Sequence, residues 1–215
     1  MLKITSRSSK KTPMIAIIGP DGVGKSTILS LLANEYRHKK IKGVFILKRF
    51  NEENSGELDE GTPVGNYAKP PRSIPVTLLK LGFKVAPWLF KYYTRLLPMR
   101  HSGTLVICDH FYFLMIMLDP LKFRISGPDS MRKFLYRVLP KPDFYIYLDA
   151  PVDVVYSRKQ QTTREELAQL IERHHEFLSG IPNRVYVDAN RPVTEVMVDI
   201  SQTISRIIDA SMGAG

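Results

Sequence analysis

The sequence is short of three things that would each point to a class of protein: cysteines, long apolar runs and acidic residues in its middle part. Cys108 is the one cysteine in 215 residues, which excludes a disulfide within the chain and favours a reducing, cytoplasmic setting. The apolar runs Met14–Ile18 and Phe111–Leu118 have five and eight residues, whereas a membrane-spanning helix needs about 20. We therefore expect neither a spanning helix nor a signal peptide.

The shortage of acids is confined to one segment. Residues 61–142 contain 13 Lys/Arg and three acids (Asp109, Asp119 and Asp129), and the remaining residues hold 18 of each sign. The whole net charge of +10 therefore lies in this segment. Either it forms a solvated basic surface, or it faces something acidic: a phosphorylated acceptor, nucleic acid or an anionic membrane.

Short apolar segments alternate with helical patterns along the chain. This alternation predicts an α/β fold of three layers, a five-stranded parallel sheet flanked by helices, with its site at the carboxyl ends of the strands. Residues 1–12 are polar and basic, and we expect a disordered arm there before a single domain over residues 13–215. We expect strands at Met14–Ile18, Gly43–Phe50, Thr104–Asp109, Asp143–Asp149 and Arg184–Asp188, and helices at Lys25–His38, Ile74–Leu97 with a kink or break at Pro87, Phe111–Asp119, Ser130–Leu139, Val152–Gln160, Thr163–Ser179 and Val193–Asp209.

A glycine-rich loop follows the first predicted strand and opens the first predicted helix. It fits the P-loop (Walker A) pattern G-x-x-x-x-G-K-[ST] without a gap, and it predicts ATP or GTP binding. Glycines let backbone N–H groups turn around an anion, and the helix start adds the positive end of its dipole. Lys25 would reach the β- and γ-phosphates, and the Ser26 hydroxyl would ligate Mg²⁺. The candidate nucleotide-binding residues of the loop are Gly19, Asp21, Gly22, Val23, Gly24, Lys25, Ser26 and Thr27.

The remaining sequence narrows the class of nucleotide enzyme. No N-K-x-D run is present, which a GTPase would use to read guanine, and no L-S-G-G-Q run, which marks transporter ATPases. The chain is also too short for the paired motors of a helicase.

Several segments together resemble the thymidylate kinases, a family of P-loop nucleoside monophosphate kinases. They are Gly-Pro-Asp-Gly-Val-Gly-Lys-Ser-Thr (19–27), with its loop aspartate, Leu-Val-Ile-Cys-Asp (105–109), Lys-Pro-Asp-Phe-Tyr-Ile-Tyr-Leu-Asp-Ala-Pro (141–151), Ser-Arg-Lys-Gln (157–160) before Glu-Glu-Leu (165–167), and Val-Asp-Ala (187–189). The likeness covers residues 14 to about 208. It implies a P-loop kinase with ATP and Mg²⁺ as cofactors, and typically a homodimer.

The resemblance also implies roles for individual residues. Lys25, Asp109 and Arg158 would be catalytic, and Asp109 would join Ser26 at the metal, through water, or act as general base. Arg158 and Lys159 would belong to a mobile LID at about residues 157–165 that closes over the ATP phosphates. Asp21 would accept a hydrogen bond from an acceptor hydroxyl, and the alternative is that it only stabilises the loop.

The chain departs from the family pattern on the acceptor side. The R-E-P-G turn after the second strand is missing, with Arg49 as a possible substitute, and His110 replaces the arginine of the D-R-[YFH] motif. Arg72 and Arg124 are further candidates for the acceptor site. The departures at the R-E-P-G turn and at His110 favour an acceptor other than dTMP. The middle segment also resembles divergent thymidylate kinase-like proteins associated with surface polysaccharide synthesis.

The predicted helix over residues 74–97 combines a narrow cationic stripe, formed by Lys80, Lys84, Lys91 and Arg95, with a broad apolar face. It is either a core helix with a solvated side or an interfacial helix on an anionic membrane. No pattern of the chain is typical of a nucleic-acid reader, so we expect no nucleic-acid partner.

Three functions remain open at this point. The first is an ATP-dependent kinase with a small-molecule, glycan or lipid-linked acceptor, cytoplasmic or held at the inner membrane surface. The second is a kinase of dTMP or another nucleoside monophosphate. The third is a regulatory protein that binds ATP without catalysis.

Overall fold

The computed structural model describes residues 11–38, 44–47, 70–109, 118, 124–160 and 162–212. Its centre is a parallel sheet of five strands: β1 (Met14–Ile18), β2 (Val44–Leu47), β3 (Leu105–Asp109), β4 (Phe144–Asp149) and β5 (Arg184–Asp188). The strand order is β2-β3-β1-β4-β5, so β1 lies in the middle between β3 and β4. The predicted α/β class with a parallel sheet is confirmed.

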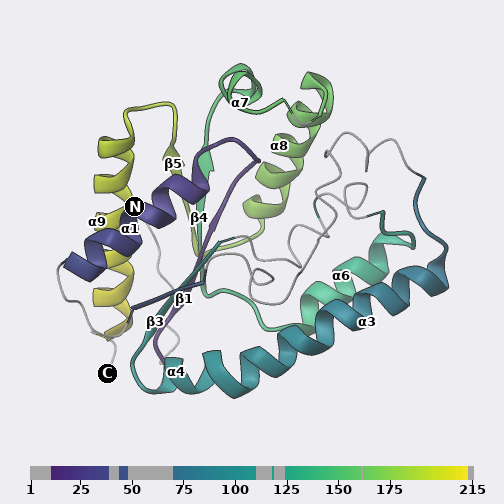
Figure 1. The fold of residues 1–215 in the computed structure, drawn as a ribbon, viewed down its shortest axis with the longest axis horizontal. Coiled ribbons are helices and arrows are strands. Elements are labelled where there is room, and N and C mark those ends of the chain that lie inside the picture. Colours follow the sequence, from purple (N-terminus) through teal and green to yellow (C-terminus); the bar gives the residue numbers. More distant parts are fainter. Residues whose placement is uncertain are drawn as a thin grey trace.

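Helices cover both faces of the sheet (Figure 1). One face carries α1 (Lys25–His38) and α9 (Val193–Met212), and the other carries α3 (Ile74–Lys91), α4 (Leu97–His101), α6 (Asp129–Val138) and α8 (Arg164–Ser179). The short helix α7 (Val152–Arg158) lies beyond the carboxyl end of β4.

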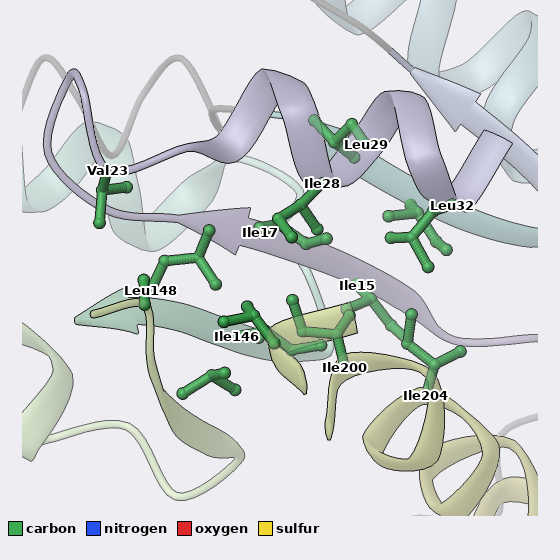
Figure 2. Packing of buried hydrophobic residues seen from close by; sticks show 14 of the residues in the cluster. Ile15, Ile17, Val23, Ile28, Leu29, Leu32, Ile146, Leu148, Ile200 and Ile204 are labelled. Carbon is green, nitrogen blue, oxygen red and sulfur yellow. The ribbon is translucent and has the colours of Figure 1, made fainter. Parts of the chain in front are cut away.

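Alternate residues of β1 belong to two separate cores. Ile15 and Ile17 pack with Leu29 and Leu32 of α1 and with Ile200 and Ile204 of α9 (Figure 2). Met14, Ala16 and Ile18 pack on the opposite side with Leu81 and Trp88 of α3. All five β1 side chains are buried, as expected for a central strand covered on both faces.

Of the kink or break predicted at Pro87, the break is wrong, because α3 runs without interruption from Ile74 to Lys91, and the kink stays a prediction. The N–H that proline lacks would have bonded the carbonyl of Phe83, and both residues are exposed, so water can take its place. The irregular hydrogen bonding comes later, in the π-helical turn η1 (Tyr92–Leu96) that joins α3 to α4.

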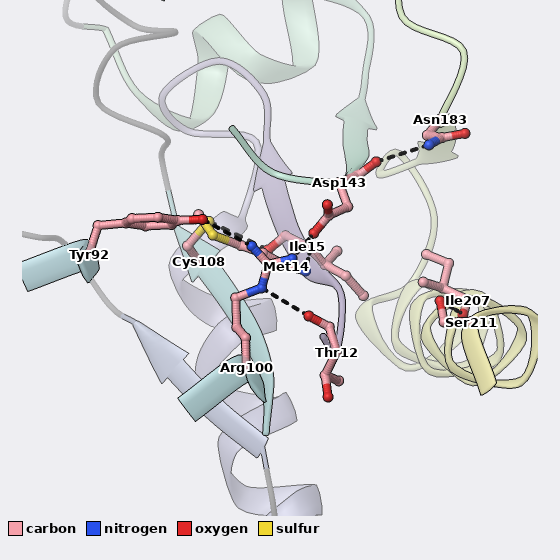
Figure 3. Close-up of polar contacts among 10 residues, drawn as sticks. All are labelled: Thr12, Met14, Ile15, Tyr92, Arg100, Cys108, Asp143, Asn183, Ile207 and Ser211. Carbon is pink, nitrogen blue, oxygen red and sulfur yellow. Dashed lines mark hydrogen bonds and ion pairs between the residues drawn. The ribbon is translucent and has the colours of Figure 1, made fainter. Parts of the chain in front are cut away.

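An ion pair with a buried arginine joins α4 to the amino ends of β1 and β4 (Figure 3). The Arg100 guanidinium, 1% exposed, pairs with the Asp143 carboxylate and donates from Nε to the Thr12 carbonyl at 2.9 Å. The same carboxylate accepts the N–H of Met14 at 2.8 Å. Asp143, which belongs to the family-like segment 141–151, therefore stabilises the end of the sheet opposite to the P-loop.

Several other predicted segments lie partly or wholly outside the described residues. Most of the predicted arm 1–12, nearly all of the helix expected at Phe111–Asp119 and the ends of the strand expected at Gly43–Phe50 lie outside them. The division into an arm and one domain stays a prediction. So does the mobile LID, whose residues join the end of α7 to the start of α8.

Candidate functional site

The loop between β1 and α1 has the backbone of a phosphate-binding turn. Gly22 and Gly24 have φ angles of +94° and +108°, which residues other than glycine rarely adopt. A Cβ at Gly22 would lie 2.9 Å from Cβ of Lys159, so the loop packs directly against the residue after α7. A Cβ at Gly24 would meet no atom within 4 Å, so that side of the loop faces open space.

Lys25 is held inside this loop. Its ammonium, on a side chain that is 4% exposed, donates to the carbonyls of Gly19 at 2.8 Å and Pro20 at 2.7 Å. The Asp21 carboxylate lies 3.7 Å from the same nitrogen. This contact agrees with the alternative that Asp21 stabilises the loop. The predicted contact of Asp21 with an acceptor hydroxyl stays a prediction.

The start of α1 fits a nucleotide phosphate. The first helical bond runs from Ile28 N to Gly24 O, and the first turn of a helix leaves its N–H groups without intrahelical partners. Ser26 and Thr27 in this turn are exposed, so the Ser26 hydroxyl is accessible to a phosphate-bound Mg²⁺. Three or more His, Cys, Asp or Glu side chains that would hold a metal by themselves do not come together anywhere in the described ranges.

The predicted site residue Arg158 is far from the P-loop along the sequence, but it lies against the loop in the structure. Its Nη1 is 3.5 Å from the Val23 carbonyl and 3.5 Å from the Ala189 carbonyl, so the end of α7 contacts both the P-loop and the loop after β5. Lys159 follows against Gly22. The predicted donor-side residues are therefore neighbours in space, and their roles toward ATP stay predictions.

The register of the sheet places the backbone of Asp109 beside the P-loop. Its Cα pairs with that of Ile17, two residues before Gly19, at the carboxyl end of β3. This is where an aspartate behind the metal would lie, because the carboxyl ends of neighbouring parallel strands share one edge.

Two features of this edge were not predicted. In the loop after β5, Arg191 pairs with Asp199 and lies 3.7 Å from Asp188, and its hydrogen bond to Asp199 raises its pKa. The Ala189 N–H donates to the Asp149 carbonyl at 2.7 Å, which fixes this loop against β4. No local pattern predicts a role for Arg191, because its acidic partners lie at the end of β5 (Asp188) and in the first two turns of α9 (Glu195 and Asp199).

The second feature is an aromatic cluster under α8. His175 lies 3.3 Å from the Asp149 carboxylate and stacks on Tyr186 at 5.4 Å between ring centroids. Tyr147 meets both rings edge-on, and burial raises the pKa of its phenol. The cluster ties α8 to the carboxyl ends of β4 and β5.

The acceptor-side candidates divide into two groups. Arg49 and His110 lie outside the described residues. The structure brings Arg72 and Arg124 together, with the Arg72 N–H donating to the Arg124 carbonyl at 3.3 Å and Arg124 in the left-handed region at φ +52°. Their corner lies at the start of α3, apart from the β1–α1 loop in Figure 1. Neither arginine is shown beside the P-loop.

The chain is similar to thymidylate kinases in sequence and in fold. It is 27% identical over 203 residues to the probable thymidylate kinase of Archaeoglobus fulgidus, which covers 91% of this chain and 96% of the relative. It is 23% identical over 216 residues to the thymidylate kinase of Desulfotalea psychrophila, 94% and 98% of the two chains. The crystal structure of thymidylate kinase from Ehrlichia chaffeensis matches 90% of this chain and 99% of its own, with a TM-score of 0.58 and 16% identity. No family model matches the chain.

The loop geometry and these likenesses agree on the class of protein. The chain is an enzyme, a thymidylate kinase-like P-loop phosphotransferase whose cofactors are ATP and Mg²⁺.

Proposed function

We propose that the protein transfers the γ-phosphoryl group of ATP to a nucleoside monophosphate, and that dTMP is its first-choice acceptor. The observation that carries this proposal is the agreement between a P-loop that the end of α7 contacts and relatives named thymidylate kinase along nearly the whole chain. The glycan or lipid-linked acceptor expected from the sequence has no support from these relatives. A purely regulatory ATP-binding protein disagrees with the enzyme class stated above.

Bound Mg²⁺ neutralises charge between the phosphates in this chemistry, and the protein supplies positioning. We assign the backbone N–H groups of residues 22–26 and the Lys25 ammonium to the β- and γ-phosphates. Ser26 is the metal ligand on α1, and Asp109 stands behind it at the end of β3. Arg158, already beside the Val23 carbonyl, covers the transferring phosphate from the LID side.

The Lys25 contacts suggest how the site changes when it binds. Its ammonium donates to two carbonyls of its own loop, and it would exchange these bonds for a phosphate oxygen when the nucleotide binds. Because it is nearly fully buried, the charge acts in a medium of low dielectric, where it stabilises an anion more strongly than in water.

A coupled ADP-release assay tests the proposal on the full chain with Mg-ATP and a panel of dTMP, dUMP, AMP, CMP and GMP. We expect the largest kcat/KM for dTMP. Lys25→Ala should lower kcat/KM on the order of 10²–10³-fold, the cost typical of removing one group that stabilises transition-state charge. Arg206→Ala, an exposed cation on α9, is the matched control and should leave turnover unchanged.

Two results would contradict the proposal. Turnover of none of the five nucleotides by a chain that still binds ATP would remove the nucleotide acceptor and reopen the glycan or lipid-linked acceptor. Turnover at the wild-type rate by Lys25→Ala would remove the P-loop from the mechanism.

A further inference from the structure

The helix α8 contacts two different parts of the molecule near the edge of the sheet where the P-loop lies. It starts beside α7 and continues toward the sheet (Figure 1). His175 lies 3.3 Å from the Asp149 carboxylate, at the carboxyl end of β4. Two residues nearer the start of the helix, Nη1 of Arg173 donates to the Leu118 carbonyl at 3.1 Å. A helix rises about 1.5 Å per residue, so Arg173 stands close to the level at which the parallel strands end.

Leu118 is suited to this bond by its place in the chain. It is helical and 4% exposed, and it belongs to the same core cluster as Leu178 of α8. In the sequence Pro120 follows two residues later, and a helix usually ends at or before the residue that precedes a proline. Carbonyls in the last turn of a helix lack intrahelical partners, and a cation is favourable beside them. Arg173 meets both needs, because it brings a donor and a positive charge.

The Arg173 guanidinium has the Leu118 carbonyl as its main partner. Within the described residues, the ion pairs of α8 use Arg164 and His175 and leave Arg173 without a carboxylate. Its other contact runs from Nη2 to Gln169 Oε1 at 3.5 Å, one turn earlier in the same helix. A charged donor makes a stronger hydrogen bond than a neutral one. The half-buried side chain therefore ties α8 to a segment that lies 55 residues away along the chain.

Leu118 leads back to the acceptor side of the candidate site. Residues 110–117 connect it to Asp109, whose backbone the register of the sheet places beside the P-loop. His110, a candidate for the acceptor site, is the first of these residues. The sheet thus holds one end of this connection, and Arg173 holds the other.

We propose that Arg173 is a positioning residue for the phosphoryl acceptor. By holding the Leu118 carbonyl, it keeps residues 110–118 in the arrangement that receives the acceptor, and it attaches them to the helix at whose start the predicted LID ends. This role rests on the proposed function, because it takes the acceptor to be a nucleoside monophosphate that contacts this segment. Arg173 acts through Leu118 and touches neither the acceptor nor ATP.

Steady-state kinetics of the full chain with Mg-ATP and dTMP test this role. Arg173→Met keeps an apolar stem and removes the donors. When the segment is in place for only part of the time, the apparent affinity for the acceptor falls by that fraction. We expect the KM for dTMP to rise about tenfold, the factor typical of one lost hydrogen bond to a charged group, and the KM for ATP to change less than about twofold. Arg173→Lys, which retains a charged donor, should recover most of the affinity for dTMP.

Arg184→Met is the matched control. Arg184 is also half-buried and also donates to a backbone carbonyl, that of Ile181, but it lies at the amino end of β5, away from the P-loop. This variant should leave both KM values unchanged. Circular dichroism should be the same for all variants, which separates a positioning defect from misfolding.

Hydrogen exchange read by mass spectrometry adds a measurement that needs no turnover. In Arg173→Met, peptides covering residues 110–118 should exchange faster than in the wild type, whereas peptides covering β1 should not. If this difference appears but the wild type phosphorylates none of the nucleotides, the positioning of the segment is supported and the proposed acceptor is wrong. Equal exchange in the two proteins would overturn the role of Arg173. So would a KM for dTMP that rises equally in Arg173→Met and Arg173→Lys, or a KM for ATP that rises as much as that for dTMP.

Discussion

Lys25 and Asp143 lie beyond opposite ends of β1, and their charges serve different purposes. Lys25 stands in the loop at the carboxyl end, where its ammonium is held by carbonyls of Gly19 and Pro20. Asp143 stands at the amino end, where it satisfies Arg100 and the N–H of Met14. We predict that the first charge meets a ligand, whereas the second holds α4 and two strands together. Their substitution should therefore separate activity from stability.

Asp143→Asn should lower the free energy of unfolding by about 2–3 kcal/mol, because Arg100 would stay buried without its carboxylate. The cost falls below that of a fully buried pair since Asp143 is itself 35% exposed. Urea unfolding with an unchanged m-value measures it. Asp153→Asn, which breaks an exposed ion pair with Arg164, is the control and should change stability by less than about 0.5 kcal/mol. Affinity for ATP should be the same in both variants, and a wild-type midpoint for Asp143→Asn would contradict the structural role.

At the scale of elements, α8 begins with a complete capping box. Thr163 Oγ1 accepts the Glu166 N–H at 3.2 Å, and the Glu166 carboxylate accepts the Thr163 N–H at 3.0 Å. A second hydroxyl, from Thr162, donates to the same carboxylate. These bonds to the ionised form lower the pKa of Glu166, with Thr162 as the main cause. The predicted LID, at about residues 157–165, would end at this capping box.

Thr163→Ala should destabilise the protein by about 1 kcal/mol, the usual cost of losing an N-cap, and thermal melts at pH 7 measure it.

Glu166→Gln tests the same capping box through its pH dependence. The folded-state pKa of Glu166 is lowered, so its ionised form contributes its full stability above the ordinary value of 4.5, and this contribution is lost as the pH falls through the folded-state pKa. The stability difference between wild type and Glu166→Gln should therefore shrink from pH 7 to about pH 3. Thermal melts at both pH values measure it, with Ser130→Ala on α6, where no side-chain cap forms, as the control. A difference that does not vary with pH would show that the capping carboxylate is not ionised.

At the scale of the whole molecule, the candidate nucleotide site is assembled from two strand-to-helix loops and the end of a helix. The β1–α1 loop, the end of α7 and the loop after β5 meet around Arg158. A ligand held by all three would stabilise the complete fold, because it binds the folded chain alone.

Mg-ATP at about 100 times its dissociation constant should stabilise the protein by about 2.7 kcal/mol, seen as a rise in Tm. Arg158→Ala should reduce this rise at the same ATP concentration and leave the Tm without ligand nearly unchanged, since its side chain is exposed. Arg164→Ala is the control from the other end of the LID, where the guanidinium is engaged with Asp153 on the surface. An equal rise in Tm for both variants would exclude Arg158 from the ATP site.

Local features of the chain were predictable from the sequence alone. The P-loop could be predicted because its residues are consecutive and each glycine acts within its own turn. The fold class and the apolar strands could be predicted because the pattern of burial follows from the order of neighbouring residues. The effect of Pro87 could not, since its cost depends on whether the Phe83 carbonyl meets water, and the exposed side of α3 decides this.

Only the tertiary structure brings Arg158 to Val23, 135 residues away along the chain, or Arg72 to Arg124. It also decides which of the two apolar faces of α3 is buried. Periodicity marks both faces as apolar, and packing against the sheet chooses the side of Leu81 and Trp88, leaving Phe83 and Phe90 outside. The sequence by itself thus determined the fold class and the phosphate-binding loop, which arise from contacts between near neighbours. The assembled site and the exposed face depend on contacts between distant segments, which no local pattern encodes.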